Sequence, residues 1–250
     1  MSKETPPPFS LWLRELPWLG AIAAGRFRRA RKIDLDFKAI GNLPPVLVFP
    51  GIVSSDNSTS LLRRTLEANG FPVYGSKLGF VTGVTPERMA RAERRLEEIA
   101  QRHVEPVVLL GWSLGGIYAR VLAQRHPKKA KMVVTLGTPF SGDRHANNAW
   151  RLYNALNDHT VDEPSLPDDP SVKPPVHTVA VEALNEGVIG RGCAWGKGEE
   201  RDSAHLVTAR HFALGSSRRS VEEVVQIVTQ ELAMGQRVTE DQPRTNAVST

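Results

Sequence analysis

The stretch Pro106-Val107-Val108-Leu109-Leu110 leads directly into Gly111-Trp112-Ser113-Leu114-Gly115-Gly116. The first five residues have the apolar character of a buried strand, and the residues after the glycines continue with helical spacing. A strand, a tight turn through G-x-S-x-G and a helix together form a nucleophile elbow. The turn needs small neighbours, which Gly111 and Gly115 provide. The pattern predicts that Ser113 projects above a sheet as a nucleophile, although an ordinary glycine-rich strand-to-helix turn has a similar sequence.

Strand and helix patterns alternate on both sides of this elbow. Alternation of this kind predicts an α/β fold, with a mostly parallel sheet and helices on both faces. A proline-rich insert at about 141–175 lacks strong periodicity and is expected to form a cap or lid over the site. The expected strands are 46–49, 71–74, 107–110, 132–136, 176–181 and 206–208, and the expected helices are 60–69, 86–103, the segment after Ser113, and 221–234.

Composition limits the class of protein. The 250 residues, 40% of them hydrophobic, suit one domain at 45–235, preceded by an amphipathic and basic segment at 1–44 and followed by a polar tail at 236–250 that we expect to be disordered. One cysteine, Cys193, excludes an intrachain disulfide. No zinc-site spacing and no nucleic-acid-binding signature is present, so neither a metal nor nucleic acid is expected, despite the net charge of +5.

The N-terminal stretch 9–32 combines apolar residues with a run of arginines. It is too broken by Arg14, Glu15 and Pro17 for a clear signal peptide and too short to span a bilayer. Two interpretations remain open. The stretch is a helix packed against the domain, or it is an interfacial anchor that touches a membrane surface. The expected location is the cytoplasm.

Partners for the nucleophile follow in the chain order serine, acid, histidine. The acid belongs in the loop after the strand that follows the insert, which offers Glu182 and Glu186. Glu186 is favoured because Gly187 permits a turn there, whereas Glu182 can still lie on the strand. Asp202 is a third, less favoured acid.

The histidine belongs after the final strand, which favours His211 over His205 as the general base. An oxyanion hole needs two backbone N–H groups, and the expected donors are Leu114, directly after the nucleophile, and Ile52, in the loop after strand 46–49.

With these residues in place, residues 45 to 232 resemble a bacterial α/β-hydrolase of the lipase/carboxylesterase type. The resemblance rests on Phe49-Pro50-Gly51-Ile52-Val53-Ser54-Ser55-Asp56, Ser58-Thr59, Leu62-Arg63-Arg64, the elbow through Arg120, and Leu136-Gly137-Thr138-Pro139-Phe140-Ser141-Gly142. It implies Ser113 as nucleophile and His211 as base. Glu186-Gly187 stands where the family commonly has Asp-Gly, and Pro50-Gly51 stands where many lipases have His-Gly.

These residues predict a serine hydrolase that cleaves carboxylic esters through an acyl-enzyme, without a cofactor. The expected partner is a small-molecule ester, which the apolar N-terminal segment suggests is lipid-like. Two alternatives stay open. One is an acyltransferase, thioesterase or amidase with the same groups, and the other is a non-catalytic binding protein of the same fold. Nothing in the sequence indicates an oligomeric state.

Overall fold

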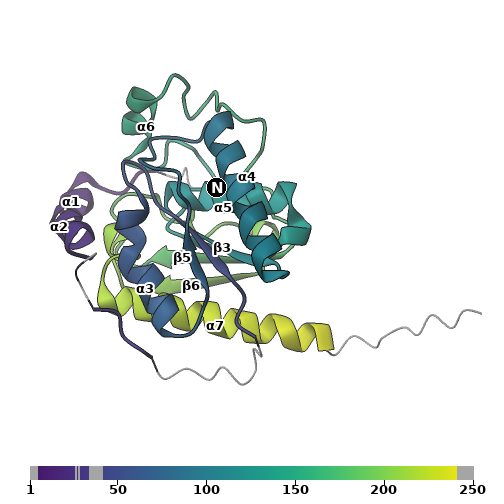
Figure 1. The fold of residues 1–250 in the computed structure, drawn as a ribbon. Helices are drawn as coiled ribbons and strands as arrows, with labels where there is room; N and C mark the ends of the chain where they lie inside the picture. Colours follow the sequence, from purple (N-terminus) through teal and green to yellow (C-terminus); the bar gives the residue numbers. More distant parts are fainter. Residues whose placement is uncertain (1–4, 26, 28, 34–41, 241–250) are drawn as a thin grey trace, which may run out of the picture.

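The computed structural model describes residues 5–25, 27, 29–33 and 42–240. Within these residues, six parallel strands form one sheet in the order β2-β1-β3-β4-β5-β6 (Figure 1). The strands are β1 (Val46–Phe49), β2 (Val73–Gly75), β3 (Val107–Trp112), β4 (Ala130–Leu136), β5 (His177–Ala183) and β6 (Ser203–Val207). The direction in which strands are added reverses between β1 and β3. The loops that follow these two strands therefore open a crevice, which is where ligands bind in sheets of this topology.

Helices cover both faces of the sheet. They are α3 (Ser60–Ala68), α4 (Pro86–His103), α5 (Leu114–Arg125) and α7 (Arg218–Glu240). Successive strand residues face opposite sides, so β1 feeds two cores. Val46 and Val48 pack with α3 and α7, while Leu47 and Phe49 pack with α4 and α5. All four are completely buried, which explains why this strand reads as a continuous apolar run.

The expected elements are present, with shifted ends. The helix predicted at 86–103 has those bounds because Pro86 occupies its first turn and the Thr85 side chain accepts a hydrogen bond from the Arg88 N–H at 3.3 Å. The last strand begins at Ser203, earlier than expected. The last helix continues to Glu240, so 236–240 is helical where disorder is expected from the sequence, because no glycine or proline within 236–240 ends the helix. Residues 241–250 lie outside the described residues.

The insert at 141–175 is not irregular throughout, because it contains the short helix α6 (Trp150–Leu156). It is tied to the domain near its C-terminal end. Arg120 of α5, fully buried, donates to the carbonyl oxygens of Ser171 at 3.1 Å and Glu200 at 2.8 Å. Arg125 binds the Asp168 carboxylate at 2.9 Å. The insert therefore lies above α5 as a cap (Figure 1).

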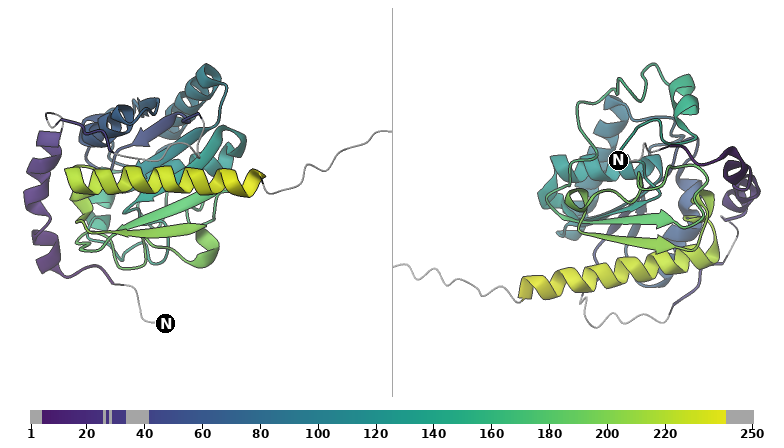
Figure 2. Two further views of the ribbon diagram at one scale, coloured as in Figure 1. Left: turned by 90° about the horizontal axis from the view of Figure 1, so that it is seen from below. Right: turned by 180° about the vertical axis from the view of Figure 1, so that it is seen from behind.

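Two short helices, α1 (Phe9–Leu13) and α2 (Leu16–Gly25), lie beside the sheet at the end toward which its strands point (Figures 1 and 2). Trp18 and Ile22 pack against the core on the α3 and α7 side. The interpretation of this stretch as a helix packed against the domain therefore holds for the face that carries Trp18 and Ile22. None of the described helices is both long enough and apolar enough to cross a membrane.

Candidate active site

Ser113 occupies a strained turn between β3 and α5. Its backbone has φ 53° and ψ −123°, a region that residues other than glycine rarely adopt. Two hydrogen bonds, one to β4 and one from a residue after β4, hold this turn in place. The Ser113 N–H donates to the Leu136 carbonyl at 2.8 Å, and the Thr138 hydroxyl donates to the Ser113 carbonyl at 2.9 Å. A Cβ on Gly111 would collide with the backbone of Gly115, so the two elbow glycines make this turn sterically possible.

The loop after β1 passes directly over the nucleophile. A Cβ on Gly51 would lie 3.3 Å from the Ser113 Cβ, which measures how closely the loop approaches. Val53 is held at φ 54° by a hydrogen bond from its N–H to the Val81 carbonyl at 2.7 Å. Between them, Ile52 forms no backbone hydrogen bond with another described residue through its N–H. Leu114 is the first residue of α5, where the helix offers its N–H no acceptor. Both predicted oxyanion donors thus border the serine.

The structure brings Glu186 and His211 together. The His211 Nδ1 lies 3.0 Å from Oε2 of Glu186, with the histidine 1% and the glutamate 8% exposed. The other carboxylate oxygen, Oε1, accepts the N–H groups of Val188 at 2.8 Å and Ile189 at 3.0 Å. Glutamate has one methylene more than aspartate, and this extra length is accommodated because the carboxylate folds back onto the backbone of the turn that follows Glu186. His211 shares the wall of one cavity with Ser113.

Four influences act on the pKa of the His211 imidazole. Burial lowers it most strongly, but the charge of Glu186, the hydrogen bond to Glu186 and the charge of Glu15 outweigh burial and raise the pKa above its ordinary value. The Glu186 carboxylate also holds the proton on Nδ1, which leaves Nε2 free as an acceptor.

The alternative candidates lie elsewhere. Glu182 is on strand β5, as the sequence allowed, and burial raises the pKa of its carboxyl. His205 lies within β6 and binds Glu231 of α7 at 2.5 Å. Asp202 accepts the Thr178 N–H at 2.8 Å. No described contact joins His205 or Asp202 to the elbow.

Sequence reasoning missed two residues that hold His211. The Trp112 indole donates to the His211 carbonyl at 3.2 Å. Glu15, fully buried, accepts the backbone N–H groups of His211 at 3.1 Å and Phe212 at 3.2 Å. The only signal for Glu15 in the sequence is its position as an acidic residue that interrupts an apolar stretch.

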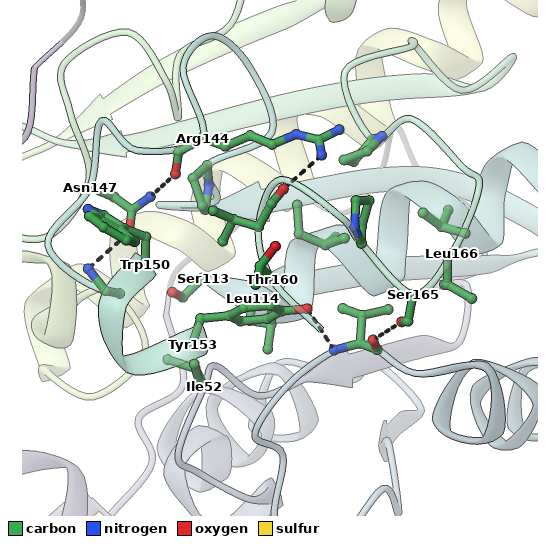
Figure 3. A pocket seen from close by; sticks show the side chains of 18 of the residues that line it. Ile52, Ser113, Leu114, Arg144, Asn147, Trp150, Tyr153, Thr160, Ser165 and Leu166 are labelled. Atoms are coloured by element: carbon green, nitrogen blue, oxygen red, sulfur yellow. Dashed lines mark hydrogen bonds between the residues drawn. The ribbon is translucent and has the colours of Figure 1, made fainter. Parts of the chain in front are cut away.

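Two cavities meet at Ser113. The larger, about 1160 Å³, also touches His211 and the oxyanion loop, and its outer wall is α2 with Trp12. The smaller, about 150 Å³, lies beneath the insert between α5 and α6 (Figure 3). Several polar groups in its lining are already paired within the protein. The Tyr153 hydroxyl binds His159 at 2.8 Å, the Ser165 hydroxyl binds the Val84 carbonyl, and Arg144 binds the Val161 carbonyl. The smaller cavity therefore offers a ligand mostly hydrocarbon.

Known proteins share this architecture. The family profile for the alpha/beta hydrolase fold matches residues 44–167. A monoacylglycerol lipase from Paleococcus ferrophilus is 14% identical, with a TM-score of 0.52 over 77% of this chain and 96% of that one. The carboxylesterase CesB from Bacillus subtilis is 12% identical, with a TM-score of 0.53 over 90% and 99%. The thioesterase domain from the curacin biosynthetic pathway is 14% identical, with a TM-score of 0.54 over 74% and 91%. No curated protein matches the sequence. The chain has the alpha/beta hydrolase fold.

Proposed function

We propose that this alpha/beta hydrolase is a serine esterase that cleaves carboxylic esters with Ser113, His211 and Glu186. The observation that carries the proposal is the junction of three features around Ser113, which lines the larger cavity together with His211 and Ile52. These are a serine in a strained elbow, a buried histidine whose Nδ1 is held by a carboxylate, and two N–H groups beside the serine. Such a set serves nucleophilic acyl transfer rather than metal-dependent hydrolysis.

In the proposed acylation, the Ser113 Oγ attacks the ester carbonyl carbon while Nε2 of His211 takes the hydroxyl proton. The carbonyl oxygen becomes an oxyanion that accepts hydrogen bonds from the N–H groups of Ile52 and Leu114. When the tetrahedral intermediate collapses, the bond to the alcohol oxygen breaks and His211 returns its proton to that oxygen. The alcohol leaves, and the acyl group remains as an ester on Ser113.

Deacylation repeats the sequence with water. His211 removes a proton from water as the oxygen attacks the acyl carbon, and the same two N–H groups hold the second oxyanion. Collapse expels the Ser113 oxygen, which takes the proton back from His211. The products are a carboxylic acid and the free enzyme, and every proton is accounted for without a cofactor.

The two cavities suggest the substrate class. A cavity of about 150 Å³ with apolar walls accommodates a group about the size of benzene. We therefore assign the smaller cavity to a hydrocarbon group of roughly six carbons, either the acyl chain or the alcohol part. The larger cavity takes the other part of the ester, with far less restriction on its size.

The rim of the larger cavity supports a lipid-like substrate. Leu16, Leu19, Phe27 and Phe80 line this cavity and are also exposed, at 40%, 48%, 75% and 59%. The exposed cations Arg29, Arg31 and Lys32 follow in the chain. We propose that this rim contacts anionic bilayers, since apolar side chains beside cations favour such surfaces. Co-sedimentation with phosphatidylglycerol vesicles should decrease in a Leu19→Ser/Phe27→Ser variant. Equal binding by wild type and variant would refute the membrane contact.

The test of the esterase proposal is fluorophosphonate labelling with hydrolysis of p-nitrophenyl esters of increasing chain length. Wild type should label and hydrolyse, Ser113→Ala should do neither, and Ser141→Ala should behave as wild type. Ser141 is a matched control because it is also buried but lines neither cavity. Wild-type turnover by Ser113→Ala would exclude the mechanism.

The alternatives predict different products. A thioesterase or amidase would favour thioester or amide substrates, and an acyltransferase would give a second product when alcohols or amines are added. The fold neighbours include a thioesterase domain, so thioesters belong in the substrate panel. A folded wild-type protein that neither labels nor hydrolyses would favour the non-catalytic binding protein.

A further inference from the structure

We infer that the N-terminal segment, residues 5–25, is part of the active site, and that Glu15 is a positioning residue for His211 and Glu186. This inference rests on the proposed function. The juxtaposition that carries it is a buried carboxylate bonded to the backbone of both loops that present these residues.

Glu15 joins two loops that lie far from it in the sequence. One oxygen, Oε1, accepts the N–H of Gly187 at 3.1 Å and that of His211 at 3.1 Å. The other, Oε2, accepts the Phe212 N–H at 3.2 Å. Gly187 directly follows Glu186 in the loop after β5, and His211 follows β6. A single side chain therefore fixes the separation of the two loops, and with it the separation of the imidazole from its carboxylate.

The chain around Glu15 is shaped for this contact. Glu15 lies in the turn between α1 and α2, directly before Leu16 begins the second helix, and Pro17 occupies the first turn of that helix. A Cβ on Gly187 would lie 2.6 Å from the Leu11 carbonyl oxygen, so only glycine lets the segment approach the acid loop this closely. Asn148 of the insert links the same two parts, because its amide donates to the Pro7 carbonyl at 3.1 Å and the Gly187 carbonyl at 2.9 Å.

Burying a carboxylate is costly unless hydrogen bonds or charges compensate for lost hydration. Burial raises the pKa of Glu15, and the Glu186 charge adds to that rise. The backbone hydrogen bonds from Phe212 and His211 and the His211 charge oppose it. Two charged groups, Glu186 and Glu15, act on His211, and both raise its pKa. His211 and Glu186 are in turn the charged groups that act on Glu15. A purely structural contact could be made by an uncharged side chain, whereas Glu15 adds a negative charge at the base.

The test compares Glu15→Gln and Glu15→Ala in the full chain, with Glu67→Gln, an exposed glutamate of α3, as the charge-matched control. Glu15→Ala removes the shared acceptor, and a misplacement of 1 Å at such a site costs on the order of 100-fold. We expect kcat/KM to fall by about that factor, mainly through kcat. In both Glu15 variants the acid limb of the pH profile should move to lower pH, because a negative charge near His211 is lost. Glu67→Gln should match wild type.

The second readout does not need activity. The His211 Cε1–H resonance, assigned with His211→Gln, is titrated by NMR in Ser113→Ala and in Ser113→Ala/Glu15→Gln. A lower titration midpoint in the double variant supports the inference even if wild type hydrolyses nothing, in which case only the proposed function fails. An unchanged midpoint overturns it. The inference is also overturned if the activity of the variants falls only in proportion to the folded protein that thermal melts detect. It is overturned as well if neither Glu15 variant folds.

Discussion

Replacing Glu186 with glutamine should disable the base while leaving the fold intact. The substitution keeps the length of the side chain. Its amide oxygen can still accept the N–H groups of Val188 and Ile189, now 2.8 and 3.0 Å from Oε1. The amide nitrogen then faces Nδ1 of His211 in place of Oε2. Because the amide nitrogen is a donor, His211 must present an unprotonated Nδ1 and carry its proton on Nε2, where it cannot accept the Ser113 proton.

The size of this effect follows from the tautomer. The equivalent change in a serine protease lowers kcat about 10⁴-fold. We expect a fall of about 10³- to 10⁴-fold here, which corresponds to roughly 4 to 5.5 kcal/mol of lost transition-state stabilisation. The free energy of unfolding should change little in Glu186→Gln. In Glu186→Ala the free energy of unfolding should decrease, because two buried N–H groups lose their acceptor, which costs about 1–3 kcal/mol for each group.

The assay measures kcat and KM for a p-nitrophenyl ester, with urea unfolding of each variant. Glu182→Gln is the matched control, since Glu182 is similarly buried, at 6%, and precedes Glu186 by four residues in the chain. Glu182→Gln should keep kcat within about threefold of the wild-type value, because this substitution does not change the tautomer of the His211 imidazole. The reasoning is refuted if Glu186→Gln keeps more than about a tenth of wild-type kcat, or if Glu182→Gln loses as much.

Three further outcomes are expected. Because the pKa of His211 is raised and the base must be neutral, kcat/KM of wild type should rise with pH through a value above the ordinary histidine pKa of 6.5, and a midpoint at or below it would contradict this. Hydrolysis should decline for groups longer than about six carbons in the smaller cavity, and Trp150→Ala should extend the accepted length; an identical chain-length profile would exclude this assignment. Burial raises the pKa of Glu231, but the hydrogen bonds with His177 and His205 outweigh burial and lower it from 4.5 to about 2. The stabilisation, roughly 3 kcal/mol at most, should be complete above pH 4.5 and lost toward pH 2, and urea unfolding of Glu231→Gln should lack this dependence.

Local patterns in the sequence predicted most of the sheet and the elbow. The buried strands and α4 depend on periodicity and on caps such as Thr85, which neighbouring residues determine. Glu186 and His211 could be proposed because a parallel sheet brings the ends of its strands to one edge. The sequence did not predict the full length of α7 or the helix α6, since residues 236–240 and the seven residues of α6 have no strong apolar stripe in their sequence.

The contacts of the N-terminal segment could not be predicted in the same way. Glu15 and His211 are separated by 196 residues, and no spacing rule relates them. From sequence, an acidic residue between Leu13 and Leu16 weakens an apolar segment, whereas in the fold the same residue satisfies three backbone donors beside the base. The two interpretations of this segment, a helix packed against the domain and an interfacial anchor, are also compatible with each other. Its inner face packs against the domain through Trp18 and Ile22, while Leu16 and Leu19 remain exposed at the rim of the larger cavity. In this segment Glu15 binds both loops of the site, and the neighbouring Leu16 and Leu19 line the larger cavity. The proposed contact with a lipid surface would therefore act on the same segment that positions the base.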